Sequence, residues 1–318
     1  MNFKDFKDKY QKIEPEHFPN SVSLDPVVSI CIQSYNHERY IHQCLDSILT
    51  QELDFSYEIL IGEDNSSDKT RELCINYALK YPDKIRLFLH HTENKIKVDS
   101  LYTGNFNSFY NFYQARGKFI AFCDGDDYWT DPKKLKTQIK ILEENQKYVL
   151  CYHSFSESYE GKNLSENELD QPKLDLSQNE LQRLKFHPQL STVCFRNILQ
   201  ELPEEMIKVI NLDSFLLSFL GYFGKAKFCS NIQPNVYRRH GDGIWSGEAH
   251  QKKLLIKINT YTQLSRYHKR YGNGELGIHF KLIKHNIVKS LFIYYLTNHP
   301  LKAFLLIPDL LRTKSLKF

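Results

Sequence analysis

Short apolar runs alternate with helical patterns along the first part of the chain. The apolar runs predict buried strands over residues 27–33, 57–61, 85–89 and 118–123. Between them, apolar residues recur with the period of a helix over residues 38–50, 68–81 and 105–114. Strands separated by helices indicate βαβ units. We therefore expect an α/β fold with a mainly parallel sheet that helices cover on both faces.

The patterns on either side of this region are weaker. Residues 1–24 are polar without a clear period and predict a loosely packed extension. A helix is expected to begin near Pro132, which Asp131 can cap, and the polar stretch 156–182 predicts an exposed loop or short insertion. Later patterns predict strands at 191–195 and 225–229, a helix over 212–222, and further helices from about residue 248.

Composition and charge exclude several classes of protein. The net charge of +4 is too small to indicate a nucleic-acid-binding protein. The seven cysteines are scattered, odd in number and without a C-x-x-C pair, which argues against a disulfide framework or a zinc site. The charged N-terminus lacks the apolar core of a signal peptide, and no apolar run is long enough to span a membrane. The expected location is the cytoplasm.

Three carboxylates follow the last of the expected parallel strands, in the segment Asp124-Gly125-Asp126-Asp127. Ligands of a parallel sheet bind beyond the carboxyl ends of its strands, and Gly125 permits a tight turn there. Because neighbouring carboxylates repel one another, the cluster favours a bound Mg²⁺ or Mn²⁺ that holds a diphosphate. An ordinary solvated turn explains the same spacing, so the residues alone leave both interpretations open.

Three segments, in order, resemble motifs of family 2 glycosyltransferases. Val28–Asn36 resembles the first strand and nucleotide-gripping loop, Glu58–Asp68 resembles the strand that ends in paired acids, and Asp124–Pro132 resembles the DxD region. The resemblance covers roughly residues 26–246. It implies a GT-A fold, a Rossmann-like sheet flanked by helices, and an inverting, metal-dependent transferase of the bacterial glycan-biosynthesis type.

The same resemblance implies three parts of the chain. We expect an N-terminal extension over residues 1–25, a catalytic domain over 26–247 and a C-terminal helical segment over 248–318. Within the catalytic domain, the nucleotide half is expected over about 26–127 and the acceptor half over about 128–247.

The resemblance also assigns residues to the sugar nucleotide. Asp64 is expected to accept a hydrogen bond from the base, most simply from the imide N–H of uracil, because a carboxylate cannot donate. An Asx-turn or a helix N-cap is the structural alternative for Asp64, and a cap is the role that we expect for Asp68. Arg238 and Arg239 can neutralise phosphate charge. The residues expected to border the nucleotide are Ser34, Tyr35, Asn36, Glu38, Asp64, Asp124, Arg238 and Arg239.

The metal site and the catalytic base are implied in the same way. Asp126 is the expected metal ligand, with Asp124 and His240 completing the protein's share of a Mn²⁺ or Mg²⁺ site. Asp213 matches the carboxylate that the family places at the start of a helix, although Leu212 stands where Glu or Gly is usual. It would take the proton of the acceptor hydroxyl. Alternatively, Asp213 is a first-turn acid that favours the helix dipole.

The acceptor side and the C-terminal segment are less sharply defined. The residues expected near the acceptor or the transferred sugar are Ser191, Thr192, Asp127 and Trp245, with a structural role as the alternative for Asp127. Residues 282–318 combine apolar clusters with Lys and Arg. This pattern is typical of helices that lie on the inner face of a membrane, pack on a catalytic domain or join subunits. The first arrangement would suit a lipid-linked acceptor.

The activity expected from the resemblance is transfer of a hexosyl or N-acetylhexosaminyl group from a nucleoside-diphosphate sugar, with UDP-sugars favoured. The acceptor would be a hydroxyl of a glycan, lipid-linked or protein-linked molecule. A metal-dependent nucleotidyltransferase or phosphate hydrolase also uses clustered Asp residues, but the sequence has no Gly-rich phosphate loop with a lysine. A non-catalytic module that binds sugar nucleotides is the other alternative, and it predicts binding without turnover.

Overall fold

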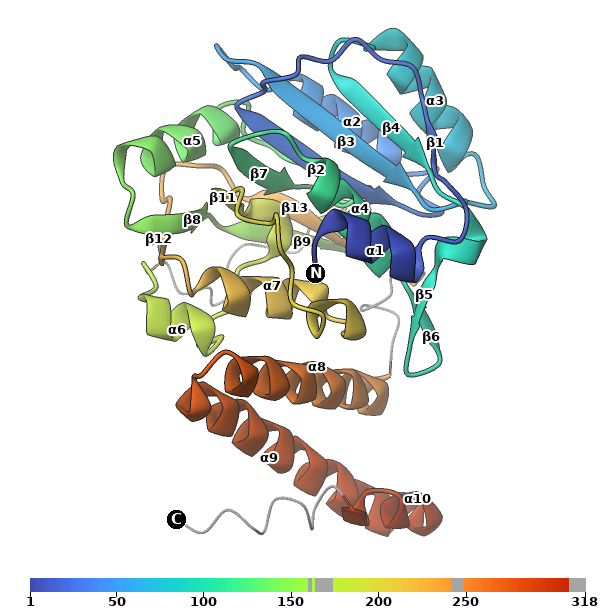
Figure 1. Ribbon diagram of the computed structural model, residues 1–318, viewed down its shortest axis with the longest axis vertical. Coiled ribbons are helices and arrows are strands. Elements are labelled where there is room, and N and C mark those ends of the chain that lie inside the picture. The colour runs from blue at the N-terminus through green and yellow to red at the C-terminus, as the bar shows by residue number, and fades with distance from the viewer. Residues whose placement is uncertain (160–161, 164–173, 242–248, 309–318) are drawn as a thin grey trace.

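The central sheet is built on the apolar runs that the sequence pattern predicts. The computed structural model describes residues 1–159, 162–163, 174–241 and 249–308, and Figure 1 shows the sheet between layers of helices. The strand order along the sheet is β1 (Glu16–His17), β4 (Ile85–Leu89), β3 (Tyr57–Glu63), β2 (Val28–Ser34), β7 (Phe119–Phe122), β11 (Cys194–Arg196), β8 (Tyr148–Tyr152) and β12 (Lys225–Phe228).

Parallel pairing brings the loops of the first strands together. Strands β4, β3, β2 and β7 run parallel, whereas β11 is antiparallel to both of its neighbours. Ser34 at the end of β2 lies opposite Glu63 at the end of β3. Beyond β7, the N–H of Gly125 donates to the carbonyl of Gln33 at 3.1 Å. The loops that follow β2, β3 and β7 therefore meet at one edge of the sheet.

Helices with one apolar face cover both sides of the sheet. One hydrophobic core contains Ile30 and Ile32 of β2 and side chains of α2 (Ile41–Leu49), α3 (Thr70–Lys80) and α5 (Lys134–Glu144). The other core contains Cys31 and side chains of α4 (Asn105–Gln114) and α7 (Leu212–Leu220). Successive side chains of a strand point to opposite faces, so β2 contributes to both cores. The mainly parallel α/β fold with helices on both faces is thus confirmed.

The N-terminal residues are packed, so the prediction of a loose extension over residues 1–24 is wrong. Helix α1 (Phe3–Tyr10) begins with a capping box in which Asn2 and Asp5 satisfy each other's backbone N–H groups. Its Phe6 is fully buried, 5.2 Å between ring centroids from Phe106 of α4. The N-terminal amine donates to the carbonyl of Leu202 at 2.9 Å. The apolar residues at positions 3, 6 and 10 carry the helical period that the surrounding Lys and Asp residues obscure.

The polar stretch 156–182 is not simply an exposed loop. Part of it lies outside the described residues, but β9 (Phe155–Tyr159) pairs with β10 (Lys162–Asn163) and with β13 (Asn235–Arg239) in a second, small sheet. It ends in α6 (Gln178–Gln182), whose Leu181 is fully buried. The strand expected at 191–195 is displaced, because residues 190–192 form a 3₁₀ turn, η3 (Leu190–Thr192), before β11 begins.

The C-terminal segment is helical, as expected, over the residues that the structure describes. It consists of α8 (His250–Arg270), α9 (Gly274–Asn298) and α10 (Pro300–Phe304), which lie below the catalytic layers in Figure 1. Helix α8 is anchored on α7, where His268 Nε2 lies 3.0 Å from Ser218 Oγ. In the described part of the chain, none of the helices has both the length and the apolar character that membrane crossing requires.

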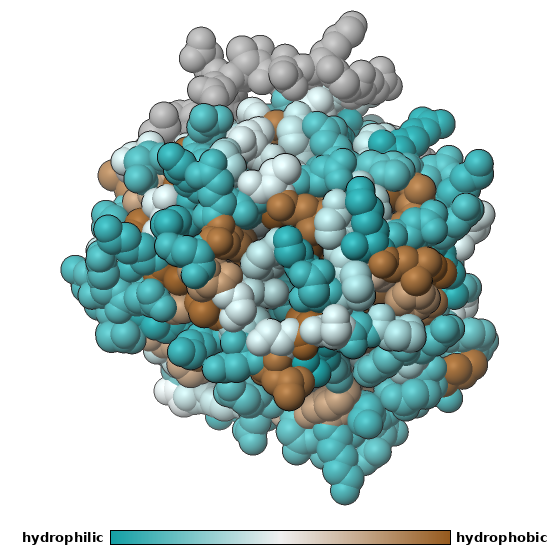
Figure 2. Space-filling view, turned by 90° about the horizontal axis from the view of Figure 1, so that it is seen from above, coloured by the Kyte–Doolittle hydropathy of each residue, from teal (hydrophilic) through white to brown (hydrophobic). Residues whose placement is uncertain are grey.

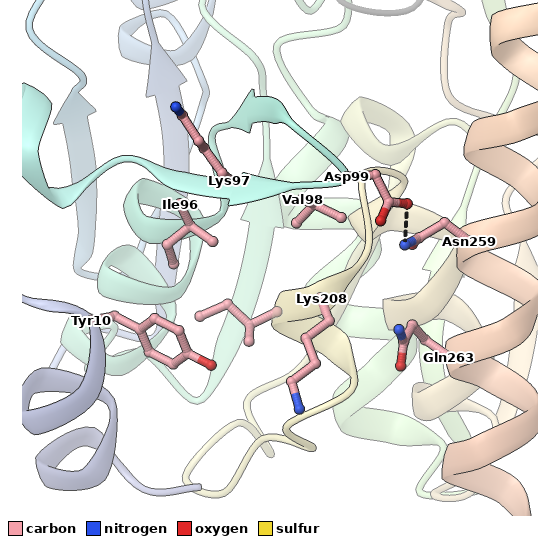
Figure 3. Close-up of a pocket in the computed structure, with 9 residues that line it drawn as sticks. Tyr10, Ile96, Lys97, Val98, Asp99, Lys208, Asn259 and Gln263 are labelled. Atoms are coloured by element: carbon pink, nitrogen blue, oxygen red, sulfur yellow. Dashed lines mark hydrogen bonds between the residues drawn. The ribbon is translucent and has the colours of Figure 1, made fainter.

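The remaining elements lie beside the central layers. A hairpin of β5 (Ile96–Val98) and β6 (Leu101–Thr103) follows the 3₁₀ turn η1 (Thr92–Asn94), and a further 3₁₀ turn, η4 (Met206–Lys208), precedes α7. A cavity of about 250 Å³ lies between the hairpin, α1 and α8, where Asn259 donates to Asp99 at 2.8 Å (Figure 3). None of the residues expected at the functional site lines this cavity.

Candidate active site

The acidic loop after β7 packs tightly on the loop after β2. Gly125 lies against His37, because a Cβ atom at position 125 would stand 2.6 Å from His37 Nδ1. Any side chain at position 125 would therefore separate the two loops. The close approach that glycine permits sets Asp124 and Asp126 at the sheet edge where parallel α/β folds bind ligands.

Asp126 is held between two histidines. Its Oδ2 lies 3.0 Å from His240 Nε2 and 3.9 Å from His37 Nε2. Burial opposes ionisation, but His37 and His240 outweigh it and hold the pKa of Asp126 below its ordinary value. The structure thus joins two expected metal ligands, Asp126 and His240, that are far apart in sequence. The sequence interpretation missed His37, whose only signal was its place in the loop after the first strand.

Asp124 and Asp127 differ from Asp126 in their electrostatics. Burial raises the pKa of Asp124 to about 7, and the charges of Asp126 and Asp213 add to the shift. Asp127 is fully buried and accepts the backbone N–H of Arg238 at 2.9 Å and the side-chain amide of Gln189 at 3.1 Å. Its pKa lies well above the ordinary value because of burial and the two neighbouring carboxylates. The mutual repulsion expected from the sequence is therefore present.

The fit of a divalent cation can be judged from these donors. In the part of the chain that the structure describes, no three or more His, Cys, Asp and Glu side chains are grouped tightly enough to enclose an ion. Mg²⁺ and Mn²⁺ commonly bind through one or two protein carboxylates and complete their shells with phosphates and water. Asp126, with Asp124 and His240 beside it, fits such an open site.

Asn36 and Glu38 join the loops after β2 and β3. Asn36 has a positive φ of 56°, and its Oδ1 accepts the N–H of Ser67 at 2.9 Å. Glu38 Oε2 accepts the N–H of Lys69 at 3.0 Å. Both side chains brace the second loop against the first, while Ser34 is buried at the end of β2. The brace fixes the position of Tyr35, which is 45% exposed between these residues.

Asp64 faces a lysine that the sequence interpretation missed. Lys95 Nζ lies 3.7 Å from Asp64 Oδ2 and 3.5 Å from the centroid of the Tyr35 ring. Burial raises the pKa of Asp64 to about 7, and Lys95 opposes the rise. A buried carboxylate beside an ammonium group and an exposed aromatic ring can receive a planar polar group such as a nucleobase.

The turn after β3 is capped by neighbours of Asp64. The N–H of Thr70 donates to Asp68 Oδ1 at 2.9 Å, and the N–H of Ser66 donates to Glu63 Oε1 at 2.7 Å. Glu63 also forms an ion pair with Arg71. Asp68 therefore accepts the first backbone N–H of α3, but the N-cap position is Lys69, one residue later than expected, and Lys69 makes no side-chain cap bond. Because Asp68 and Glu63 already accept these backbone N–H groups, the residues favour a ligand-binding role for Asp64 over a capping role.

Asp213 lies in the first turn of α7 and is accessible. Its side chain is 40% exposed, and its Oδ2 lies 3.5 Å from His187 Nε2. The same His187 nitrogen lies 3.0 Å from Ser214 Oγ. The charge of Asp213 contributes to the raised pKa of Asp124, so the two carboxylates lie within range of each other's charge. The structure thus places Asp213 near the expected metal ligands, with His187 as a neighbour that no motif indicated.

Several expected contacts are engaged within the protein. The buried hydroxyls of Ser191 and Thr192 donate to the side chain and the carbonyl of Gln189. Arg238 donates to the carbonyl of Asp126 and to Gln43, with its guanidinium 4.5 Å from the ring centroid of Tyr128. Arg239 pairs with Glu157 at 2.9 Å. Trp245 lies outside the described residues.

Comparison with known proteins assigns the chain to a family. Residues 29–202 match the family model described as glycosyl transferase family 2, and the chain belongs to that family. An uncharacterized protein of Mycobacterium tuberculosis strain H37Rv is 33% identical over 69% of this chain and 60% of its own length. An uncharacterized glycosyltransferase of Nostoc sp. is 27% identical over 67% of this chain and 65% of its own. The chain therefore spans less than two thirds of these relatives.

Solved structures show the same fold at low sequence identity. Staphylococcus aureus TarS 1–349, in complex with UDP-GlcNAc, aligns with a TM-score of 0.55 and 18% identity over 85% of this chain and 74% of its own. The mannosyltransferase PcManGT from Pyrobaculum calidifontis, in complex with GDP-Man and Mn²⁺, aligns with a TM-score of 0.52 and 15% identity over 95% and 84%. These likenesses confirm the GT-A-type fold expected from the sequence.

Proposed function

We propose that this chain transfers a sugar from a nucleoside-diphosphate sugar to a hydroxyl of a glycan, lipid-linked or protein-linked acceptor, with inversion at the anomeric carbon. The observation that carries the proposal is a set of three groups, two on the loops that meet at one sheet edge and a third whose charge reaches Asp124. These groups are the Asp126–His240 pair, the Asp64–Lys95 pair and the accessible carboxylate of Asp213. Membership of glycosyltransferase family 2 supports it.

The Asp64–Lys95 pair is proposed to bind the base. Asp64 accepts an imide N–H, and Lys95 donates to the carbonyl beside it, while Tyr35 supplies an aromatic surface. Uracil offers this donor–acceptor edge, and guanine offers a similar one. The TarS complex contains UDP-GlcNAc and the PcManGT complex contains GDP-Man, so both nucleotides occur among proteins of this fold. We favour UDP because the resemblance to family 2 glycosyltransferases implies it.

The diphosphate is proposed to lie over the acidic loop. Asp126, with Asp124 and His240, would hold Mn²⁺ or Mg²⁺, and the bound ion would neutralise the leaving diphosphate. PcManGT was solved with Mn²⁺, which supports a metal site in this fold. Asn36 and Glu38 act here by holding the two loops together, and Arg238 acts by fixing the acidic loop against β13.

Asp213 is proposed as the catalytic base. The acceptor hydroxyl loses its proton to Asp213 while its oxygen bonds to the anomeric carbon, and the bond from that carbon to the diphosphate breaks on the opposite face. His187, 3.5 Å away, orients the carboxylate. Because Asp213 is far less buried than Asp127, it can reach an acceptor that enters from solvent. Asp127, Ser191, Thr192 and Trp245 remain proposals for the surroundings of the transferred sugar.

We also propose the location and division of the chain. The described cysteines are all buried free thiols, as a reducing compartment such as the cytoplasm would allow. Residues 26–247 form the catalytic unit, with halves that meet near residue 127, and residues 248–318 form the helical appendage.

Thermal unfolding with nucleotides tests the donor site. UDP, GDP, dTDP and CMP are each added with and without Mn²⁺ to the wild-type chain and to Asp126→Asn, with Asp54→Asn as an exposed control. One nucleoside diphosphate should stabilise the wild type and the control in a Mn²⁺-dependent way, but not Asp126→Asn. Turnover then separates the alternatives, because transfer releases a nucleoside diphosphate whereas nucleotidyl transfer releases pyrophosphate. The absence of any stabilisation of the folded wild type would contradict the proposal.

A further inference from the structure

Helix α9 is apolar on two opposite sides. Its inward side contains Phe280, Val288 and Leu291, which are buried against neighbouring helices. Its outward side carries an exposed stripe, and the members of this stripe recur three, four or seven positions apart, so they share one helical face. The outward stripe consists of Ile278, Leu282, Lys289, Ile293 and Leu296.

Helix α10 packs on α9 through the cluster that contains Val288 and Leu291, and it exposes further apolar side chains. Leu301, Phe304 and Leu305 are 83%, 65% and 78% exposed, at positions that again share a helical face. Ala303 and Leu306 point the other way and are buried against α9. We call the stripe of α9 together with Leu301, Phe304 and Leu305 the outer face. In Figure 1, α8 lies between α9 and the catalytic layers, so the outer face belongs to the part of the molecule farthest from the sheet.

The sequence of α9, α10 and the residues that follow is strongly basic. From residue 276 to the C-terminus, the sequence contains a single acidic residue, Asp309. The described part of this stretch contains Lys281, Lys284, Lys289 and Lys302, and Arg312, Lys314 and Lys317 follow outside the described residues. The opposite end of the molecule has a different character. There, small apolar patches are separated by hydrophilic side chains (Figure 2).

We propose that the outer face of α9 and α10 docks on a membrane surface that contains anionic lipids. Apolar side chains flanked by lysines match a bilayer interface, where the side chains enter the acyl boundary and the ammonium groups meet lipid phosphates. Charge complementarity favours lipid over a second copy of the chain. A two-fold interface places the same patch on both partners, so the lysines of one outer face would oppose those of the other.

This docking would hold the catalytic layers above the membrane, with α7 and α8 between the outer face and the sheet. Helix α8 packs directly on α7, whose first turn carries Asp213. Burial and the charge of Asp213 raise the pKa of Tyr261 on α8, so the charge of Asp213 is felt at the helical appendage. The docking proposal itself stands without the transfer reaction, because it rests on the outer face alone.

Vesicle binding tests the proposal. The wild-type chain is mixed with vesicles of phosphatidylcholine alone, or of phosphatidylcholine with phosphatidylglycerol, and the bound fraction is measured by sedimentation at low and high salt. We expect binding to the anionic vesicles that falls with salt. A triple variant, Ile293→Gln with Leu296→Gln and Phe304→Gln, should bind at least about tenfold more weakly, since each change removes apolar surface from the interface.

A matched control removes three exposed apolar side chains elsewhere. Leu24, Leu79 and Phe223 are 80%, 63% and 51% exposed and lie outside α8–α10, so changing all three to Gln should leave vesicle binding unchanged. Circular dichroism and the UDP-dependent thermal shift confirm that each variant is folded. Failure to bind anionic vesicles, or equal binding to neutral ones, would overturn the proposal. So would a dimer in sedimentation velocity that the triple variant dissociates, because the outer face would then join two copies.

Discussion

Raising the pH from 6 to 8 should strengthen the binding of uridine about tenfold. The pKa of Asp64 is about 7 because the carboxyl is buried, although the nearby Lys95 opposes the shift. At pH 6 about a tenth of the Asp64 side chains are ionised, and at pH 8 about nine tenths are. If the ionised carboxylate accepts the imide N–H, affinity follows the ionised fraction. A tenfold change corresponds to about 1.4 kcal/mol.

Uridine itself is the right probe for this effect. It has no phosphate, so the titration of Asp124 in the acidic loop and the presence of metal do not enter the measurement. Affinity is followed by ligand-observed NMR titration at several pH values with a chelator present. Cytidine, which lacks an imide N–H, should show no comparable gain. Asp64→Asn keeps an oxygen acceptor that does not titrate, so its affinity for uridine should be independent of pH.

Lys95 provides a second test, because its removal should shift the pH dependence of uridine affinity. Lys95→Met removes the positive charge that favours ionised Asp64, so the rise in affinity should move to higher pH. In the ligand-free protein, the contribution of Asp64 to stability should fall as pH rises, whereas uridine affinity rises with pH. Because the folded chain holds the Asp64 proton more tightly than the unfolded chain does, this group lowers the free energy of unfolding as pH rises from about 4 to 7. Uridine affinity that is equal at pH 6 and pH 8 in the wild type would refute the assignment of Asp64.

Three further changes test the site and the fold. Asp213→Asn should lower the transfer rate by about 10²–10⁴-fold, measured by release of nucleoside diphosphate, while the UDP-dependent thermal shift persists; unchanged turnover would remove Asp213 from the mechanism. Asp126→Asn should lose the roughly 2.7 kcal/mol that UDP with Mn²⁺ supplies at about 100 times its dissociation constant, yet retain uridine binding. Phe6→Ala should lower the free energy of unfolding in urea by about 3–5 kcal/mol, because Phe6 is fully buried. A loss below 1 kcal/mol would restore the view of residues 1–24 as a loose extension.

Continuous apolar runs and clear helical periods predicted elements of the central layers. The boundaries of β4 and α4 match the predictions, because each is a continuous apolar or helical pattern with clear ends. The sequence pattern was weaker where an element is short or packs on the core through one or a few large side chains. In helix α1 the buried residue is Phe6, so the helical period is easily missed among lysines and aspartates. The strand β8 was missed because it follows α5 after a short connection.

The candidate site was predictable only where its residues lie in one loop. Asp124 and Asp126 are neighbours in sequence, so their proximity needed no fold. His240 reaches Asp126 through the pairing of β13 with β9 and the contact of β13 with the acidic loop, which is a tertiary effect. Lys95 follows a 3₁₀ turn after β4 and meets Asp64 from the neighbouring strand. No spacing in the sequence relates these pairs, so only the sheet register brings them together.

The three aspartates of the acidic loop show how the environment divides one motif into different roles. Asp127 is buried and accepts hydrogen bonds from Arg238 and Gln189. Its pKa is raised well above the ordinary value, and its contacts stabilise the conformation of the loop. Asp126 is kept ionised by two histidines, so it presents a negative charge before any cation arrives. Asp124, with a pKa of about 7, changes charge near neutral pH. A cation would displace the Asp124 proton and relieve the repulsion that the fold imposes, so the loop is prepared for a ligand that it does not itself contain.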